Sequence, residues 1–116
     1  MTIRYKNQGY KQTGTGKTTV FTCPTDATVI VKSIYCANND GSSAILVNMN
    51  LVDSSDSNTE YEFFRDDVAA KSQVNASPQG LNLEAGDAIT VQAATGSGKI
   101  QGAISFALID RSQENG

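Results

Sequence analysis

The chain of 116 residues contains no histidine and no tryptophan, and it has only two cysteines and two prolines. Without histidine, an imidazole can neither activate a serine or cysteine nucleophile nor ligate a metal. Without tryptophan, a sugar-stacking groove would have to rely on the four tyrosines, Tyr5, Tyr10, Tyr35 and Tyr61. These absences remove the commonest catalytic chemistries, and we expect that the protein is not an enzyme and has no small-molecule substrate.

Long apolar runs are also absent. No run approaches the roughly 20 residues needed to cross a bilayer, and the N-terminal sequence MTIRYKNQGY lacks the apolar core of a signal peptide. We therefore expect a soluble protein without a membrane partner, made in a cytoplasm. The length allows one domain with one core.

The two cysteines, Cys23 and Cys36, are expected on consecutive strands of one hairpin that turns at Pro24-Thr25-Asp26. Cys36 then lies roughly 30 Å along the second strand from the turn, at about 3.3 Å per residue. Because a disulfide needs Cα atoms within about 7 Å, the spacing favours two buried free thiols.

Short apolar runs rich in β-branched residues alternate with clusters of Gly, Asn, Asp and Ser, which is typical of strands and turns. The pattern predicts an all-β fold, a single antiparallel β-sandwich of jelly-roll or immunoglobulin type with about seven to eight strands. Three strands show one apolar face, which we expect to point into the core. These inner faces are Ile45, Val47, Met49 and Leu51, then Ile89, Val91 and Ala93, and then Ile104, Phe106 and Leu108. In the second strand two alternating faces compete, and a bulge near Lys32 and Ser33 would reconcile them. The segment 66–73 is too short for a helix to be predicted and is treated as a connection. The expected strands are Thr18–Cys23, Ala27–Ala37, Ala44–Val52, Thr59–Phe64, Lys71–Asn75, Ala88–Ala94 and Ile100–Asp110.

Charge is distributed unevenly along the chain. Residues 1–17 carry four basic side chains and no acid, whereas the remainder has five basic and twelve acidic residues. We expect an extended basic N-terminal arm at 1–17, a sandwich domain at 18–111 and a flexible tail at 112–116. The arm could lie along the acidic surface of a neighbouring subunit or be a solvated tail, while an acidic body disfavours nucleic acid. The basic residues of the arm are Arg4, Lys6, Lys11 and Lys17.

Three motifs suggest chemistry but lack the required spacing. The run from Gly14 to Thr19 resembles the end of a phosphate-binding loop, yet Lys11 stands where the first glycine is required and a strand follows, so a hinge is expected. The oxygen-rich residues Asp53, Asp56, Asn58 and Glu60 lack the spacing of a calcium loop. Glu60 and Glu62 could stand about 7 Å apart on one strand face, but no aromatic platform accompanies them. We predict no catalytic, cofactor or metal-binding residue.

The segment Leu81 to Val91 reads L-x-L-x-x-G-D-x-I-x-V, in which Gly86 can supply a positive φ and Asp87 a local side-chain hydrogen bond. Jelly rolls of the complement and tumour-necrosis-factor type carry a similar turn.

A wider part of the chain, roughly residues 18–110, resembles small β-sandwich virion proteins of tailed bacteriophages. The resemblance is carried by the segments 19–39, 51–53 (L-V-D) and 102–110 (G-A-I-S-F-A-L-I-D), together with the Gly-Asp turn. It implies a virion protein assembled in the host cytoplasm: a capsid decoration or cement subunit that binds the major capsid protein. A neck or tail accessory, or a tail-associated adhesin that recognises a host glycan or protein, stays open as an alternative.

A homotrimer would suit a decoration subunit, because a shared interface could bury apolar residues that strand alternation leaves outside the core. We expect Leu46, Phe63 and Phe64 to serve that purpose.

Overall fold

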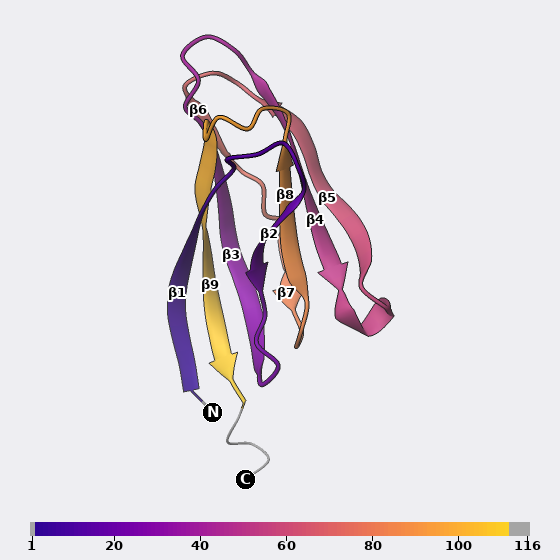
Figure 1. Ribbon diagram of the computed structural model, residues 1–116. Coiled ribbons are helices and arrows are strands. Elements are labelled where there is room, and N and C mark those ends of the chain that lie inside the picture. Colours follow the sequence, from indigo (N-terminus) through magenta and orange to yellow (C-terminus); the bar gives the residue numbers. More distant parts are fainter. Residues whose placement is uncertain (1, 112–116) are drawn as a thin grey trace.

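The computed structural model describes residues 2–111 and shows two antiparallel sheets packed face to face (Figure 1). Sheet A has the strand order β1-β9-β3-β6, with β7 also pairing with β3, and sheet B has the order β2-β8-β4-β5. The predicted all-β sandwich is confirmed, with nine strands between residues 2 and 111. The elements are β1 Thr2–Lys11, β2 Thr18–Thr22, β3 Ala27–Asn38, β4 Ile45–Asp53, the 3-10 helix η1 Ser54–Asp56, β5 Thr59–Val68, β6 Ser72–Asn75, β7 Asn82–Leu83, β8 Ala88–Ala93 and β9 Ile100–Asp110.

The connections decide between the two predicted sandwich types. Strands β1 to β4 alternate between the sheets, and the last strand β9 lies between β1 and β3. The second sheet is built in the same way, with β8 inserted between β2 and β4. This double-sheet arrangement is the jelly roll.

The core fills the space between the sheets with the alternating side chains that the sequence predicts. Ile45, Val47 and Met49 of β4 are buried, whereas Leu46 between them is exposed. The inner residues of β8 and β9 are buried too, except Leu108, which is partly buried against the core. The rings of Phe21 and Phe106 join the two sheets with centroids 4.7 Å apart. The predicted inner faces of these strands are therefore confirmed.

The predicted bulge in β3 is also present. The pairing of β3 with β9 shifts register between Val31 and Ser33. Val29 and Val31 are buried before the shift, and Ile34 and Cys36 are buried after it, so one extra residue exchanges odd for even positions on the inner face.

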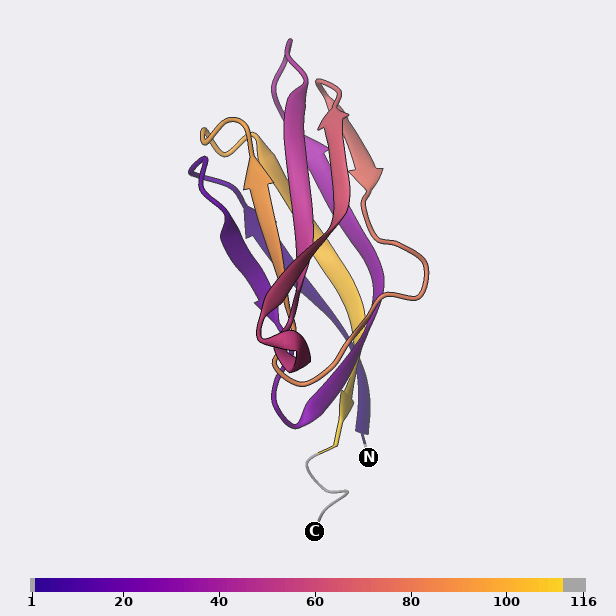
Figure 2. The same ribbon diagram turned by 90° about the vertical axis from the view of Figure 1, so that its right-hand side faces the viewer.

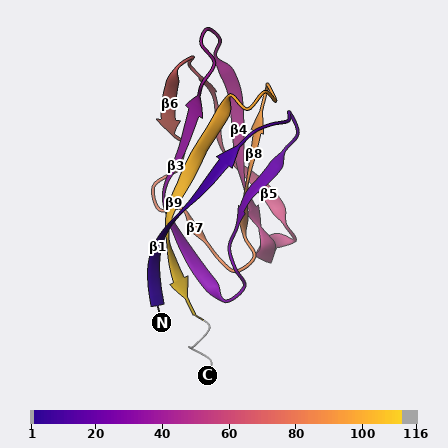
Figure 3. The same cartoon turned by 60° about the vertical axis from the view of Figure 1, so that its left-hand side comes forward.

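The N-terminal segment differs from the predicted free arm. Thr2–Lys11 forms strand β1, which pairs along its whole length with β9 at the edge of sheet A (Figure 3). Only Tyr10 of this strand is buried. An edge strand needs only its backbone to be paired on one side, so its side chains can remain exposed on both faces and need not form a buried hydrophobic face. The predicted flexible tail 112–116 lies outside the described residues.

The prediction of a hinge after Gly14 is also wrong, because residues 14–17 form a loop that contacts the sandwich. A Cβ added to Gly96 would lie 2.8 Å from the backbone of Gly14, so this loop touches the loop that connects β8 to β9. The amide of Gly98 donates to the carbonyl of Gln12 at 3.0 Å, and the side chain of Gln92 donates to the carbonyl of Thr15 at 3.2 Å. These contacts hold the crossing from β1 to β2 against the end of the sandwich.

The cysteines are buried free thiols, as predicted, but the predicted hairpin is wrong. Cys23 follows β2 of sheet B, while Cys36 lies on β3 of sheet A, so the turn at 24–26 crosses from one sheet to the other. The Sγ atom of Cys23 lies 3.4 Å from the carbonyl oxygen of Ala27 and 3.7 Å from that of Leu83. Burial raises the pKa of both thiols.

The Gly-Asp turn before β8 has the predicted conformation. Gly86 has φ +83°, and the carboxylate of the buried Asp87 accepts hydrogen bonds from the amides of Glu84 and Ser54, each at 2.9 Å. The hydroxyl of Ser54 also donates to this carboxylate at 3.0 Å. Asp87 therefore fastens its own turn to η1, which connects β4 to β5.

Candidate protein interaction surface

The four basic residues of the predicted arm occupy two different environments. Arg4, Lys6 and Lys11 are exposed on β1. Lys17 instead forms an ion pair with Glu60 of β5, Nζ to Oε1 at 3.0 Å, with both side chains about two-fifths exposed. One of the four charges is thus paired within the chain itself, and the remaining three belong to the edge of sheet A.

The predicted apolar interface residues also separate. Leu46 is 38% exposed on the outer face of sheet B. It lines a shallow depression of about 380 Å³ together with Thr15, Asn48 and Gln92.

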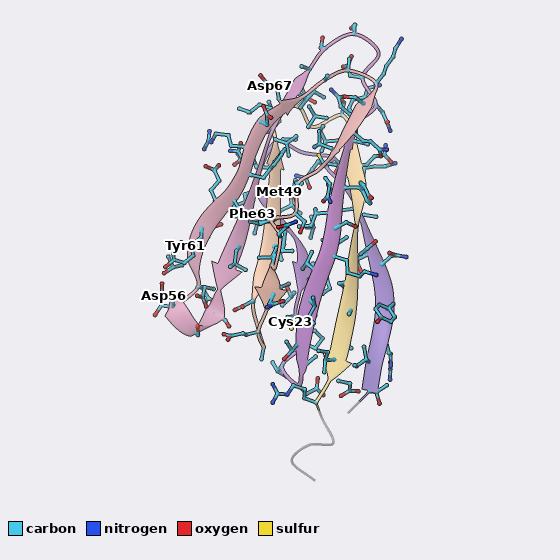
Figure 4. The ribbon with its side chains drawn as sticks, turned by 180° about the vertical axis from the view of Figure 1, so that it is seen from behind. Cys23, Met49, Asp56, Tyr61, Phe63 and Asp67 are labelled. Carbon is cyan, nitrogen blue, oxygen red and sulfur yellow. The ribbon has the colours of Figure 1, made fainter. Side chains whose placement is uncertain are left out.

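Phe63 and Phe64 are only partly exposed and pack against the core, so the prediction that they lie outside it is wrong. The pairing of β4 with β5 shifts register opposite Met49 and Asn50, and this bulge lets neighbouring residues of β5 both reach the interior. Figure 4 shows Phe63 beside Met49, away from the outer edge where Tyr61 and Asp67 lie.

A different apolar surface lies on the outer face of sheet A. Four of the six large hydrophobic side chains exposed in residues 2–111 belong to it. We call these four, Ile3, Tyr5, Ile30 and Tyr35, the apolar face.

The strand register brings three members of the apolar face together, whereas Tyr35 lies opposite Ala103, beyond the polar row of Asn7 and Ser105. Tyr5 of β1 and Ile30 of β3 stand on either side of Ala107 of β9, which is only 7% exposed although it points outward. Ile3 lies opposite Ile109 in the next outward row. The apolar face therefore continues across three neighbouring strands. Contiguous exposed apolar surface of this kind is characteristic of interaction sites.

A positive charge adjoins the apolar face. The Nζ atom of Lys32 lies 4.9 Å from the ring centroid of Tyr5, a cation–π contact that holds the two side chains together on the outside of the sheet. The sequence does contain a signal for this face, because Ile3 and Tyr5 alternate with Arg4 and Lys6. That alternation was missed because the segment was treated as an arm.

The acidic loop between β4 and β5 is organised by its own hydrogen bonds. Asp53 caps η1 by accepting from the amide of Ser55 at 3.1 Å, and Asp56 accepts a short hydrogen bond from the hydroxyl of Tyr61. The hydrogen bond to Asp56 raises the pKa of Tyr61. Within residues 2–111 no three carboxylate or thiol groups converge to hold a metal ion.

Known proteins resemble this chain in fold but not in sequence. No protein-family model matches the chain, and no curated protein matches it. Nor does the part of the chain that the structure describes contain a helix with the length and apolar character of a membrane span.

Two solved structures share the fold. The first is a chain of Bacillus endospore appendages, described as forming a family of disulfide-linked pili; it is 13% identical with a TM-score of 0.50, and the match covers 95% of this chain and 88% of that one. The second is a chain of the T13 viral particle of IBDV, 7% identical with a TM-score of 0.55. That match covers 94% of this chain but only 31% of the viral one, so the chain spans about a third of the capsid chain's length. At such identities the likeness concerns the jelly-roll fold.

Proposed function

We propose that this chain is a structural protein of a bacteriophage virion, most specifically a capsid decoration or cement subunit, and not an enzyme. It binds the major capsid protein and adds no chemistry of its own. The observation that carries the proposal is the apolar face, which exposes Tyr5 to 76% of its free area and Ile3 to 53% in a small β-sandwich. Burying about 100 Å² of such surface yields roughly 2.5 kcal/mol, which a partner that covers the face would gain as binding free energy.

The fold agrees with this role. A jelly roll is the double-sheet form used by viral capsid domains, and the T13 particle chain is a case in which a similar fold occurs in a viral particle. Fold alone does not define function, so the proposal depends on the apolar face and on what covers it.

Copy number is the first test. Quantitative mass spectrometry of purified virions should find this chain in numbers comparable with the major capsid protein. A handful of copies per particle would refute the decoration role and favour the neck, tail or adhesin alternative.

The second test identifies the surface. Capsids that lack the chain are mixed with the purified protein, and binding is measured by co-sedimentation. The double variant Tyr5→Ser with Ile30→Ser should lose binding by about a hundredfold, since each removed side chain contributes roughly 1.5 kcal/mol. Leu46→Ser, which removes an exposed apolar side chain from sheet B, should bind as the wild type does. The opposite pattern would place the contact at Leu46 and refute the role of the apolar face.

A further inference from the structure

The two lateral sides of the sandwich end in long strands with unpaired edges. Strand β1 lies at one side and β5 at the other, as the views from the front and from behind both show (Figures 1 and 4). Each strand has ten residues and pairs on one side only, β1 with β9 and β5 with β4. Such an edge presents free N–H and C=O groups that can pair with another strand.

The backbone groups at the open edge of β1 can be assigned. The amide of Gln12 donates to the carbonyl of Ile100 at 2.8 Å, at the position that continues the β1–β9 register. Hydrogen-bonded pairs alternate in an antiparallel ladder, so the even-numbered residues of β1 are bonded to β9. Ile3, Tyr5, Asn7, Gly9 and Lys11 therefore point their N–H and C=O groups outward from the sheet edge.

Strand β1 is also uncovered on the side that faces sheet B. Arg4, Lys6 and Gln8 point to that side and are exposed. An open depression of about 310 Å³, lined by Gln8 of β1 and by residues 19–22 around β2, separates the two sheets there. A strand added to β1 would find room in this depression for its inward side chains.

The edge of β5 can be assigned in the same way. The amide of Ala94 donates to the carbonyl of Leu46 at 3.0 Å, so even-numbered residues of β4 bond to β8 and odd-numbered ones bond to β5. After the bulge at Phe63, β5 therefore bonds through Asp66, opposite Val47, and leaves the backbone of Arg65 and Asp67 at the open edge. Figure 2 views the molecule from this side.

The two edges carry opposite charge. Strand β1 holds Arg4, Lys6 and Lys11 and no acid. Strand β5 holds four exposed acids, Glu60, Glu62, Asp66 and Asp67, and one base, Arg65. Glu60 and Glu62 form ion pairs with Lys17 and Arg65 within the chain, which leaves Asp66 and Asp67 as the net charge of this edge.

We propose that β1 of one copy pairs with β5 of a second copy, so that sheet A of the first continues into sheet B of the second. Opposite charges favour this pairing, whereas β1 with β1 or β5 with β5 would bring like charges together. The interface is heterologous, and it therefore closes into a ring or extends as a filament. The homotrimer predicted from the sequence is one such ring. The proposal does not depend on the capsid protein as partner.

Charge reversal provides the test. The basic-edge variant carries Arg4→Glu and Lys6→Glu, and the acidic-edge variant carries Asp66→Lys and Asp67→Lys. Sedimentation velocity should show that each variant alone is monomeric, because both of its edges now have the same sign. An equimolar mixture should restore association, because each β1 then meets a β5 of opposite charge. The control Asp26→Lys with Glu84→Lys makes the same charge change as the acidic-edge variant, but at exposed residues away from both edges. It should associate like the wild type.

A backbone variant tests strand pairing separately from charge. Asn7→Pro removes an amide at the open edge without removing a backbone hydrogen bond to β9, and proline is tolerated at such positions of edge strands. It also removes the exposed side-chain hydrogen bond from Ser105 to Asn7. It should melt within a few degrees of the wild type and be monomeric. Gln8→Pro is the matched control: it removes an amide that bonds to β9 and should lower the melting temperature.

Salt dependence completes the design. Raising the salt from about 0.05 M to about 0.5 M shortens the screening length from roughly 14 Å to roughly 4 Å, so association of the wild type should weaken. A wild-type chain that is monomeric at low salt and high concentration would overturn the proposal. So would association of the acidic-edge variant alone, which would show that β5 is not the partner of β1, or a mixture of the two charge variants that stays monomeric.

Discussion

Gly102 lies where β9 passes between β1 and β3, and an added Cβ there would make the closest contact found at any glycine of residues 2–111. A Cβ at this position would lie 1.8 Å from the carbonyl oxygen of Tyr35 and 2.9 Å from the hydroxyl of Tyr10. The same two groups form a hydrogen bond, in which the Tyr10 hydroxyl donates to the Tyr35 carbonyl at 2.7 Å. An added methyl group therefore enters a hydrogen-bonded pair and cannot be accommodated by a side-chain rotation alone.

The expected cost follows from these contacts. The Tyr35 carbonyl would have to move by about 1 Å, and inserting one carbon into a packed core costs about 1–3 kcal/mol. Displacing the carbonyl also leaves the largely buried Tyr10 hydroxyl without its acceptor, which adds about 1–3 kcal/mol. We expect Gly102→Ala to reduce the free energy of unfolding by about 2–6 kcal/mol, a large part of the total stability of a domain of this size.

Urea denaturation followed by circular dichroism measures this effect as a lower midpoint. Gly9→Ala is the control, because a Cβ at Gly9 would meet its nearest neighbour, the Gly102 carbonyl oxygen, at an ordinary 3.8 Å. It should be neutral or slightly stabilising. Tyr10→Phe combined with Gly102→Ala should recover little, since the contact with the Tyr35 carbonyl remains. If Gly102→Ala unfolds within about 1 kcal/mol of the wild type, the packing argument for this site is wrong.

Three further predictions concern groups with defined partners. Asp87→Ala should lower the free energy of unfolding by about 3 kcal/mol or more in urea denaturation, because it leaves the amide of Ser54 without an acceptor; a cost below 1 kcal/mol would contradict the bonding seen. Cys23 and Cys36 should react with a thiol reagent only at the rate of unfolding, since both are buried and their pKa values are raised; rapid labelling of the native protein would contradict this. Hydrogen bonds from the amides of Ser42 and Ser43 lower the pKa of Asp40 from 3.8, so its ionised form stabilises the native state above that pH and less as the pH falls through the lowered value. Asp40→Asn should therefore differ from the wild type in urea midpoint at pH 6 and differ less at pH 3, whereas an equal difference at both would refute the assignment.

The central strands could be predicted from the sequence because each has one face buried. The pattern selects Ile45, Val47, Met49 and Leu51 as one apolar face, and the structure buries the first three and packs the partly buried Leu51 against the core. The Gly-Asp turn was predictable for a similar reason, because the requirements of Gly86 and Asp87 are local. The assignment of strands to sheets was not, since a turn that reverses the chain within one sheet and a turn that crosses to the other use the same residue types, as the segment 24–26 shows.

Strand β1 could not be recognised in this way because neither of its faces is covered along most of its length. Apolar and basic residues do alternate at Ile3, Arg4, Tyr5 and Lys6. Alternation usually indicates a strand with one buried face, but here both faces are exposed. Its place in the sheet comes from the backbone of β9, which any sequence without proline can pair with. Local patterns therefore identify the strands that build the core and miss strands whose side chains stay outside it.

The same difference between core and edge strands applies to the charge asymmetry of the sequence. The basic segment does mark a surface of opposite charge to the body, but it forms an edge strand and not an arm. A basic segment that precedes an acidic body has the same composition whether it is free or paired at a sheet edge, but the consequences differ. A free arm can follow any acidic surface, whereas a paired strand presents its charges at fixed spacing along a line of backbone donors and acceptors. A partner of fixed geometry must then be another edge strand of opposite charge, and within this fold β5 satisfies both conditions. Because β1 and β5 lie on opposite sides of the sandwich, one copy cannot satisfy its own edges, and the two free edges are met only when copies join head to tail.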